Sequence, residues 1–549
     1  MAWSTKTVSE IVRDAVANHI SVPEFQREFV WDNGKVRDLV DSLFRDYPIG
    51  QFLVWKPPSP YGSDADEEEH RPTLWIIDGQ QRATAFCLIL GKMPAWWTER
   101  EKEEWENRKK ECDILVKVVP DDEEGVQFSL PSAVRRQDPR WVSVREIIQA
   151  SEQGTLVKFA SEIGKRLKKA GKQVNEDMLL SLLLRVAEIR SRSVVVVEVG
   201  HEVEDVAEIF TRLNQAGVRV KEADTVFALA AVKNPRWAQN EYRKFRRDLD
   251  KRNWDLPPAV IIRTVTAIGA RRARFKEVKG DFWEVGFLDA WEKTKKVISR
   301  VIKHLQDRGI VQSDLLPAKN VLIPVFVLDA LFAEQGYDFD KVFYWLLLAS
   351  KTGMYAGSAI TTLNRDVKAL HETRTPEEAV EMLVSRLSGD VEMKPEDFFV
   401  RFDRATSRFC QLLMYLLLLR RGARDWLDRV RIGVDKDGLT RLAGFSPNWH
   451  HIFPRALLRD KIPDEQVQAM ANLTILTSDT NCRRLKDKAP SEYIRLYKIN
   501  SDLLREHLIP EPFVSNPAIM VVDRYVEFIR KRAELLAEEA NRFLTSLLR

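Results

Sequence analysis

Cysteine is scarce in this sequence, and no apolar run in it is both long and uninterrupted. The four cysteines among 549 residues are scattered, without the paired spacing of a zinc knuckle or a disulfide framework. The apolar run at 412–419 is too short to cross a membrane, and the run at 321–332 is interrupted by Pro324 and Asp329. The N-terminus lacks the charged-then-apolar layout of a secretory signal. These absences exclude disulfide-rich and membrane-spanning proteins, and we expect a soluble cytoplasmic protein that has no membrane partner.

The net charge is also small, at +4, but it is unevenly distributed. Residues 401–549 contain 26 Lys and Arg against 19 Asp and Glu, a balance of +7 that leaves −3 for residues 1–400. A basic C-terminal third is typical of a domain that contacts a phosphate backbone, although a solvated helix surface produces the same excess. With 44% hydrophobic residues, a chain of this length can form two or three domains with proper cores.

The stretch from Pro447 to Tyr493 carries the most specific combination of polar side chains. Apolar alternation around Trp449 predicts one short strand, and residues 473–476 predict a second. A basic segment with helical character follows the second strand. Two strands and a helix that converge would bring together His450, His451, Asn472 and Asn481. Such a pocket could hold one divalent metal beside a general base, which suits hydrolysis of a phosphodiester.

Each of these four side chains has a separate expected role. His451 is predicted to be the general base, because an imidazole can take a proton from water near neutral pH. His450 and Asn481 are predicted to hold Mg²⁺ or Mn²⁺, since few protein ligands would leave open positions for phosphate oxygens. Asn472 is expected to orient the base or its loop. The alternative is that His450 and His451 are half-buried strand residues with satisfied hydrogen bonds.

A second candidate site lies near the N-terminus, after two predicted strands at 51–55 and 73–77. A glycine turn follows the second strand and leads into an apolar helix at 85–90. A strand, a glycine turn and a helix bring together backbone N–H groups and the positive end of the helix dipole, which favours bound phosphate. The Arg82 guanidinium would add a positive charge and several N–H donors to such a phosphate site. An equal alternative is that the segment only connects the strand to the helix. The segment consists of Asp78, Gly79, Gln80, Gln81 and Arg82.

Two sets of motifs resemble the GmrSD/SspE-type modification-dependent restriction enzymes. At the C-terminal end, His-His-Ile-Phe-Pro, Asn-Leu-Thr-Ile-Leu and Thr-Asn followed by Lys-Asp-Lys-Ala-Pro-Ser-Glu-Tyr resemble the HNH nuclease domain of that family. Near the N-terminus, Phe-Gln-Arg-x-x-Val-Trp, Tyr-Pro-Ile-Gly and Ile-Asp-Gly-Gln-Gln-Arg are similar to its ParB-like domain. The chain departs from the family pattern where His450 replaces a common acidic residue and Asn481 replaces the last His.

The resemblance implies that residues 78–82 bind and hydrolyse a nucleoside triphosphate, which could be GTP, UTP or ATP. Asp78 would be the catalytic contact to metal or water, with Gln26 and Arg27 as neighbours of the nucleotide. Asn214 and Gly217 would line the same pocket, and a helix C-cap is an equal alternative for them.

The resemblance also implies a nucleotide-regulated DNA endonuclease or nickase of antiphage defence that acts on modified double-stranded DNA. Sugar-decorated cytosine and backbone phosphorothioate are both compatible with it. The residues do not distinguish nicking from double-strand cutting, or a monomer from a homo-oligomer. One alternative keeps the nuclease and makes the N-terminal domain a passive DNA-binding module. Another is a non-catalytic DNA-binding regulatory protein with a decayed site.

The expected fold class is α+β and mostly helical. Residues 1–235 are predicted to form a ParB-like α/β domain, residues 236–395 a helical connecting region, and residues 396–549 a ββα-metal (HNH) nuclease domain. Apolar periodicity predicts an opening helix and further helices at 35–44, from 223 onward, and at 260–268, 282–305, 321–332, 342–349 and 521–548. Residues 114–119 predict a strand, and the β-branched run at 194–199 predicts a buried one.

Overall fold

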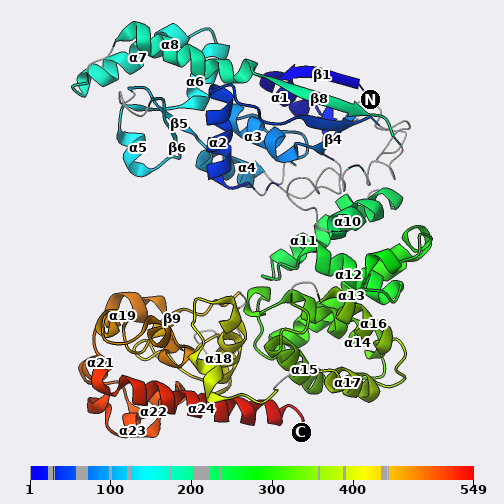
Figure 1. Ribbon diagram of the computed structural model, residues 1–549, viewed down its shortest axis with the longest axis vertical. Helices are drawn as coiled ribbons and strands as arrows, with labels where there is room; N and C mark the ends of the chain where they lie inside the picture. The colour runs from blue at the N-terminus through cyan, green and yellow to red at the C-terminus, as the bar shows by residue number, and fades with distance from the viewer. Residues whose placement is uncertain are drawn as a thin grey trace. The chain divides into compact units, whose positions relative to one another are not determined.

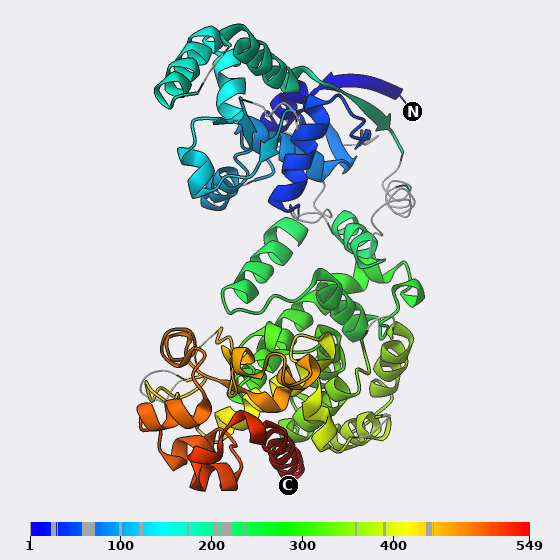
Figure 2. The same cartoon turned by 60° about the vertical axis from the view of Figure 1, so that its left-hand side comes forward.

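The computed structural model is α+β and mostly helical, as predicted, and it divides into two compact units, Met1–Ala238 and Gln239–Arg549 (Figures 1 and 2). The predicted end of the first domain at 235 lies close to this division, and the predicted boundary at 395 lies inside the second unit. The predicted site residues Gln26, Arg27, Asn214 and Gly217 lie outside the described residues. These described residues are 2–22, 29, 31–56, 72–97, 102–119, 125–172, 175–201, 209, 222–234, 237–356, 359–387, 391–434, 442 and 444–549.

The main sheet of the first unit pairs its strands in the order β1-β8-β3-β4-β2 across the residues described there. It is mixed, because β3 runs parallel to β8 but antiparallel to β4, and β2 runs parallel to β4. The predicted strands at 51–55 and 73–77 are confirmed as β3 and β4. The strands are β1 (Ala2–Thr7), β2 (Ile20–Ser21), β3 (Phe52–Trp55), β4 (Leu74–Asp78) and β8 (Ser193–Val199).

Two expectations for this sheet need correction. The chain opens with strand β1 before its first helix, because residues 2–7 pair antiparallel with β8. Thr7 then caps helix α1 (Val8–Val16) through a capping box with Glu10. The predicted buried strand β8 is only partly buried: Val194, Val196 and Val199 are buried, whereas Val195 is 42% exposed. A run rich in β-branched residues therefore did not require full burial.

In the first unit α1 packs on the main sheet, and α2, α5 and α6 pack on a small antiparallel sheet of order β6-β5-β7 (Figure 1). The predicted helix at 35–44 is confirmed as α2, whose N-cap Asp32 accepts a hydrogen bond from the Lys35 N–H. The small sheet consists of β5 (Leu115–Lys117), β6 (Phe128–Ser129) and β7 (Trp141–Ser143). The remaining elements are α2 (Asn33–Phe44), α3 (Gln80–Leu90), α4 (Lys102–Glu111), α5 (Ala133–Gln137), α6 (Val144–Glu152), α7 (Leu156–Lys169), α8 (Glu176–Ala187), η3 (Glu188–Ser191) and α10 (Glu222–Lys233).

The second unit begins with a helical region in which α12, α13 and α14 pack against one another. The predicted helices at 260–268, 282–305, 321–332 and 342–349 are confirmed there. The elements are η4 (Trp237–Tyr242), α11 (Arg243–Asp250), α12 (Pro258–Gly269), η5 (Phe275–Glu277), η6 (Phe282–Gly286), α13 (Phe287–Asp307), η7 (Ser313–Leu315), η8 (Lys319–Val321), α14 (Leu322–Phe332), α15 (Phe339–Lys351), α16 (Ile360–Leu370) and α17 (Pro376–Ser385).

The C-terminal part of the second unit places a short hairpin, β9 and β10, against the long helix α24. That helix confirms the one predicted at 521–548, and it also packs against η9 and α18. In the part of the chain that the structure describes, no helix combines the length and the apolar character needed to span a membrane. The elements are η9 (Pro395–Phe399), η10 (Ala405–Ser407), α18 (Arg408–Arg420), β9 (Trp449–His451), α19 (Arg455–Leu458), α20 (Asp464–Val467), η11 (Met470–Asn472), β10 (Leu473–Ile475), η12 (Asp479–Leu485), α21 (Pro490–Leu496), α22 (Ser501–Glu506), α23 (Glu511–Ser515), η13 (Pro517–Ile519), η14 (Val522–Arg524) and α24 (Tyr525–Ser546).

Candidate functional site

In the first unit, β4 ends at Asp78 and Gly79 turns the chain into α3. Gly79 has φ +104°, and a Cβ atom added to it would lie 2.6 Å from the Phe52 ring. Both the backbone conformation and the close approach of the ring therefore require glycine at this position. Asp78 itself is partly exposed at the end of the strand, with 45% of its side chain accessible.

We expect Gly79→Ala to destabilise the first unit by about 1–3 kcal/mol from backbone strain alone, and by more if the Phe52 ring must shift. Gly154→Ala is the matched control, because Gly154 also has a positive φ (+69°) but has no atom within 4 Å of its added Cβ. Urea unfolding of both variants measures the difference. Equal losses in the two variants would show that the contact with Phe52 contributes nothing.

Arg82 points back into the fold. Its guanidinium donates to Asp78 at 2.9 Å and to the Ile49 carbonyl at 2.7 Å, and it lies 5.0 Å from the Phe52 ring centroid. Only 14% of its side chain is exposed. The Arg82 guanidinium, which was predicted to bind phosphate, is therefore bound by groups of the protein itself. Gln81 is also buried, and its Oε1 accepts a hydrogen bond from the Trp31 N–H at 3.2 Å.

In the second unit, β9 and β10 pair antiparallel, with Thr474 opposite His450 and Leu473 opposite His451. Successive side chains of a strand point to opposite faces, so His450 and His451 lie on different faces of the hairpin. His450 is 3% exposed, whereas His451 is half-buried. The two imidazoles, which we expected to converge, therefore have separate surroundings.

His450 contacts Asn481 directly. The His450 Nδ1 lies 2.7 Å from the Asn481 Oδ1, while the Asn481 amide nitrogen donates to Asn448 Oδ1 at 2.7 Å and to the Trp449 carbonyl at 3.0 Å. This network orients the amide with its oxygen toward the imidazole. Burial lowers the pKa of His450 to about 4, so the ring is neutral near pH 7. In the neutral ring Nδ1 therefore carries the proton and donates it to Asn481 Oδ1, and the buried Nε2 has no hydrogen-bond partner among the described residues.

The 2.7 Å separation of His450 Nδ1 and Asn481 Oδ1 is that of a hydrogen bond. A divalent cation held by both side chains would have to replace this hydrogen bond and release the proton on Nδ1. Across the described ranges, no group of three or more His, Cys, Asp or Glu is arranged to hold a metal.

His451 belongs to a different network. Its Nε2 lies 3.1 Å from the Gln468 amide, and that amide is satisfied with its nitrogen toward His451 and its oxygen 3.0 Å from Arg455 Nε. Burial lowers the pKa of His451 below its ordinary value, and the nearby Arg455 charge lowers it further. His451 is therefore neutral near pH 7, the state that a general base requires. Sequence patterns gave no signal for Gln468 or Arg455.

Asn472 contacts the loop after β9. Its Oδ1 accepts from the Phe453 N–H at 2.9 Å, and its Nδ2 donates to the carbonyls of Phe453 at 3.0 Å and Val467 at 3.1 Å. It makes no contact with the His451 imidazole among the hydrogen bonds of the described residues. Asn472 thus stabilises the backbone at Phe453, two residues after His451.

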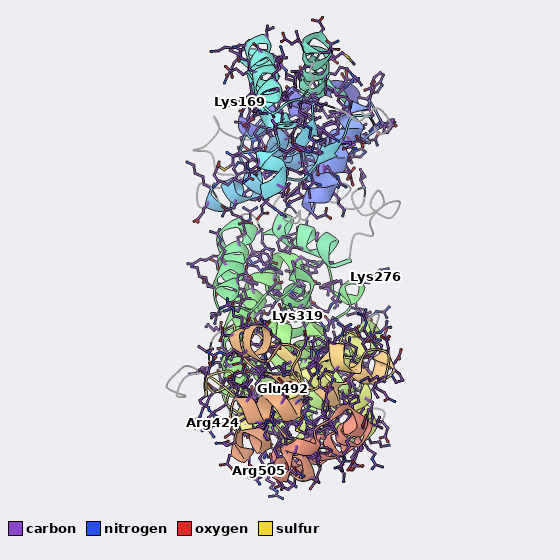
Figure 3. The ribbon with its side chains drawn as sticks, turned by 90° about the vertical axis from the view of Figure 1, so that its left-hand side faces the viewer. Lys169, Lys276, Lys319, Arg424, Glu492 and Arg505 are labelled. Carbon is purple, nitrogen blue, oxygen red and sulfur yellow. The ribbon has the colours of Figure 1, made fainter. Side chains whose placement is uncertain are left out.

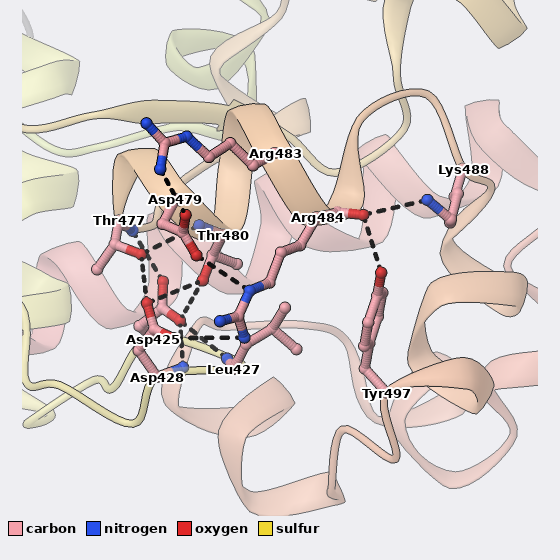
Figure 4. Close-up of polar contacts among 10 residues, drawn as sticks. All are labelled: Asp425, Leu427, Asp428, Thr477, Asp479, Thr480, Arg483, Arg484, Lys488 and Tyr497. Atoms are coloured by element: carbon pink, nitrogen blue, oxygen red, sulfur yellow. Dashed lines mark hydrogen bonds and ion pairs between the residues drawn. The ribbon is translucent and has the colours of Figure 1, made fainter.

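A buried aspartate that the sequence analysis missed positions the segment leading to Asn481 (Figure 4). The Asp425 carboxylate accepts hydrogen bonds at 2.8 Å from the N–H groups of Leu427, Asp428 and Thr477, and at 2.7 Å from Thr480 Oγ1. Burial raises the pKa of Asp425, but the combined hydrogen bonds outweigh burial and hold that pKa below its ordinary value. Asp425 is therefore ionised, and it fixes η12 at the residue before Asn481.

His507, the residue that follows α22, supports the same hairpin. Its Nδ1 lies 2.6 Å from Thr474 Oγ1, and its Nε2 lies 2.9 Å from the carbonyl of Arg424, a residue labelled in Figure 3. Thr474 lies opposite His450 in the hairpin. Burial lowers the pKa of His507 to about 4.

This pKa predicts that acid destabilises the second unit. The unfolded chain takes up a proton at His507 near pH 6.5, whereas the folded chain does so only near pH 4, so stability is lost as pH falls through this window. The loss is on the order of 3 kcal/mol. Urea unfolding at pH 7.5 and 4.5 measures it, with His507→Gln as the variant that cannot titrate. The same pH dependence in both proteins would rule out His507 as its source.

Two comparisons with known proteins bear on these sites. Residues 8–231 match the sequence family described as the N-terminal domain of the GmrSD restriction endonuclease. An uncharacterized protein of Methanocaldococcus jannaschii is 20% identical over 538 residues, which covers 90% of this chain and 87% of that protein. The match confirms the predicted resemblance to GmrSD-type restriction enzymes for this region, whereas the ParB-like fold and the role of residues 78–82 stay predictions. The N-terminal part of this chain is therefore similar to the N-terminal domain of GmrSD restriction endonucleases.

Proposed function

We propose that this protein is a metal-dependent DNA endonuclease or nickase of antiphage defence. In this proposal the first unit is a ParB-like domain that binds a nucleoside triphosphate, and the second unit contains an HNH nuclease site. The similarity of residues 8–231 to the GmrSD restriction endonuclease N-terminal domain supports the restriction role. The observation that carries the nuclease assignment is the 2.7 Å contact between His450 and Asn481. His451, the proposed base, directly follows His450 in the chain.

His451 is the proposed general base. Its imidazole is neutral near pH 7, and because the Gln468 amide donates to Nε2, the ring proton lies on Nδ1. Nε2 would accept a proton from the water that attacks phosphorus once that water takes the place of the Gln468 amide, after which one phosphorus–oxygen ester bond breaks. The Gln468 amide holds the ring at Nε2, and Arg455 holds the amide. Asn472 keeps the backbone of Phe453 in place, so the strand carrying both histidines ends in a fixed geometry.

His450 and Asn481 would hold Mg²⁺ or Mn²⁺. When bound there, the cation supplies charge neutralisation at the phosphate and at the leaving oxygen. The protein brings the two side chains into direct contact and keeps His450 neutral by burial, and a bound cation would displace the proton that Nδ1 donates to Asn481 Oδ1. Asp425 contributes by fixing the chain just before Asn481, through Thr480 and Thr477.

For the first unit we propose nucleotide hydrolysis with Asp78 as the contact to metal or water. Asp78→Ala is expected to reduce hydrolysis of GTP, UTP or ATP to background while leaving the second unit folded. Phosphate release measures the effect. The matched control is Asp41→Ala, which removes an exposed carboxylate of the same unit that pairs with Arg45. Full hydrolysis by Asp78→Ala would contradict the assignment of Asp78.

A second candidate function keeps the nuclease and makes the first unit a passive DNA-docking module. The observation that favours it is the engagement of Arg82 by Asp78 and the Ile49 carbonyl, which withholds that cation from a bound phosphate. This function predicts that the protein hydrolyses no nucleoside triphosphate and that no nucleotide alters its DNA cutting. Both results together would favour the passive docking module over a nucleotide-hydrolysing first unit.

A cleavage panel tests the proposed function as a whole. Plasmids carrying sugar-decorated cytosine, phosphorothioate linkages or no modification are incubated with the protein and Mg²⁺ or Mn²⁺, with and without each nucleotide. We expect one class of modified plasmid to be nicked or linearised, and cutting to respond to nucleotide. If every plasmid stays supercoiled under all conditions, the protein is a non-catalytic DNA-binding regulator instead.

A further inference from the structure

A cavity of about 480 Å³ opens beside the hairpin that carries the histidine pair. Ligand pockets in proteins are typically about 300–1,000 Å³. The cavity lies wholly within the second unit, between residues 312–315, residues 402–412 and the segment that enters β9. Trp449, one of its lining residues, is the first residue of β9.

Trp449 connects this cavity to the proposed base. Side chains alternate along a strand, so Trp449 and His451 lie on the same face of β9, about 7 Å apart along the strand. The Trp449 ring is half-buried and lies 5.7 Å from the Phe402 ring, tilted by 60°. Two aromatic rings thus border the cavity on the face of the hairpin that carries His451.

The charges that line the cavity favour an anionic ligand. Its acidic residues are neutralised within the chain: Asp403 pairs with Arg401 at 2.7 Å, and Asp314 pairs with Lys319, labelled in Figure 3, at 3.2 Å. In contrast, the guanidinium groups of Arg404 and Arg408 are exposed and make no ion pair or hydrogen bond with any residue that the structure describes. Arg404 and Arg408 thus have no partner within hydrogen-bond or ion-pair distance among the described residues, although the Arg404 charge also acts on the neighbouring Asp403.

Two amides in the lining offer hydrogen-bond acceptors. The Gln312 Nε2 donates to the Phe445 carbonyl at 2.9 Å, and the Gln411 Nε2 donates to the Phe402 carbonyl at 3.0 Å and to Ser407 Oγ at 2.8 Å. These bonds fix both amides with the nitrogen toward the protein. The oxygen of each amide remains as an acceptor for an N–H group of a ligand.

We propose that this cavity binds one unpaired nucleobase, with its adjoining phosphate, from the DNA strand presented to His451. The base would stack on Trp449, its amino or imino groups would donate to the glutamine oxygens, and Arg404 and Arg408 would hold the phosphate. The inference deepens the proposed nuclease function and rests on it. A free nucleotide has the same chemistry and is the alternative source of the ligand.

Binding without cleavage tests this inference. Fluorescence anisotropy of a short labelled single strand is measured with the full chain in EDTA. Stacking on an aromatic ring contributes about 1–3 kcal/mol per base, so Trp449→Ala is expected to weaken binding by about 5- to 150-fold. Trp449→Phe retains a stacking surface and is expected to lose much less. Because both arginines are exposed, Arg404→Ala/Arg408→Ala keeps the fold and is expected to weaken binding about tenfold or more.

The control double variant is Arg247→Ala/Arg530→Ala, which removes the same charge from two exposed helical positions of the second unit outside the cavity. The proposal requires this control to bind the strand nearly as tightly as wild type. Equal weakening by both double variants would overturn it, because only net charge would then matter. Unchanged binding by Trp449→Ala would overturn it as well.

Competition separates the two ligand sources. If deoxynucleoside monophosphates at millimolar concentration leave the strand bound, the cavity takes a base from DNA. If micromolar nucleotide binds in a Trp449-dependent way while strand binding does not depend on Trp449, the proposal is overturned. This binding measurement needs neither metal nor turnover, so it is independent of the test of nuclease activity. If the wild-type protein cuts no DNA but still binds the strand through Trp449, the nuclease assignment is contradicted and the base-binding proposal is not.

Discussion

His451→Ala is expected to lower the rate of DNA cutting by about 10²–10⁴-fold, the usual contribution of a general base. Burial holds the pKa of His451 below its ordinary value, so the wild-type ring is ready to accept a proton near pH 7. The variant removes that acceptor without removing His450 or Asn481. Single-turnover conversion of supercoiled plasmid, with Mg²⁺ or Mn²⁺, measures the rate.

Duplex binding and nucleotide hydrolysis serve as the readouts that the base should not affect. We expect both to remain near wild type in His451→Ala. His19→Ala is the matched control, because it removes a largely exposed imidazole from the first unit. Parallel loss of cutting, duplex binding and hydrolysis would indicate a folding defect rather than a missing base. Cutting at the wild-type rate would remove His451 from the mechanism.

Arg532→Met is expected to destabilise the second unit by about 4 kcal/mol or more. Arg532 is fully buried in α24 and donates to four carbonyls, those of Ala471, Leu473, His507 and Leu508, at 2.7–3.2 Å. A buried carbonyl left without a donor costs about 1–3 kcal/mol. Burial lowers the pKa of Arg532 to about 9, so holding this charge inside is itself unfavourable and offsets part of the gain.

Urea unfolding measures this effect, with Arg530→Met as the control in the same helix. Arg530 is exposed, and its replacement is expected to change stability by less than about 0.5 kcal/mol. Because Ala471 and Leu473 flank Asn472, the account also predicts that Arg532→Met disturbs the hairpin before the rest of the unit unfolds. A variant as stable as wild type would show that the four carbonyls find other donors.

The long helices and the hairpin could be predicted because their apolar residues repeat with the period of the element. Residues 321–332 and 521–548 show the helical repeat, and Trp449 and residues 473–476 show the alternation of strands. In contrast, β1 could not be predicted from its own residues, because its pairing partner β8 lies almost two hundred residues later. The partial burial of β8 likewise depends on its neighbours and not on its composition.

The candidate sites show the same limit. Direct contact of His450 with Asn481 agrees with the predicted convergence of these two side chains. His450 and His451 were also expected to converge, but adjacent residues of a strand point to opposite faces. The inward turn of Arg82 depends on the Ile49 carbonyl, which no motif encodes. Arg532 could have been noticed, since it occupies an apolar position of the helical repeat between Ile529 and Leu536.

The proposed nuclease mechanism depends on one divalent cation held by His450 and Asn481. Crystals of the protein grown or soaked with Mn²⁺ and a short uncleavable DNA, followed by anomalous diffraction, locate that cation. We expect manganese to replace the hydrogen bond between the two side chains, with one peak about 2–2.5 Å from both His450 Nδ1 and Asn481 Oδ1 and a phosphate oxygen among its other ligands. A manganese ion bound elsewhere, with the 2.7 Å contact between His450 and Asn481 intact, would contradict it.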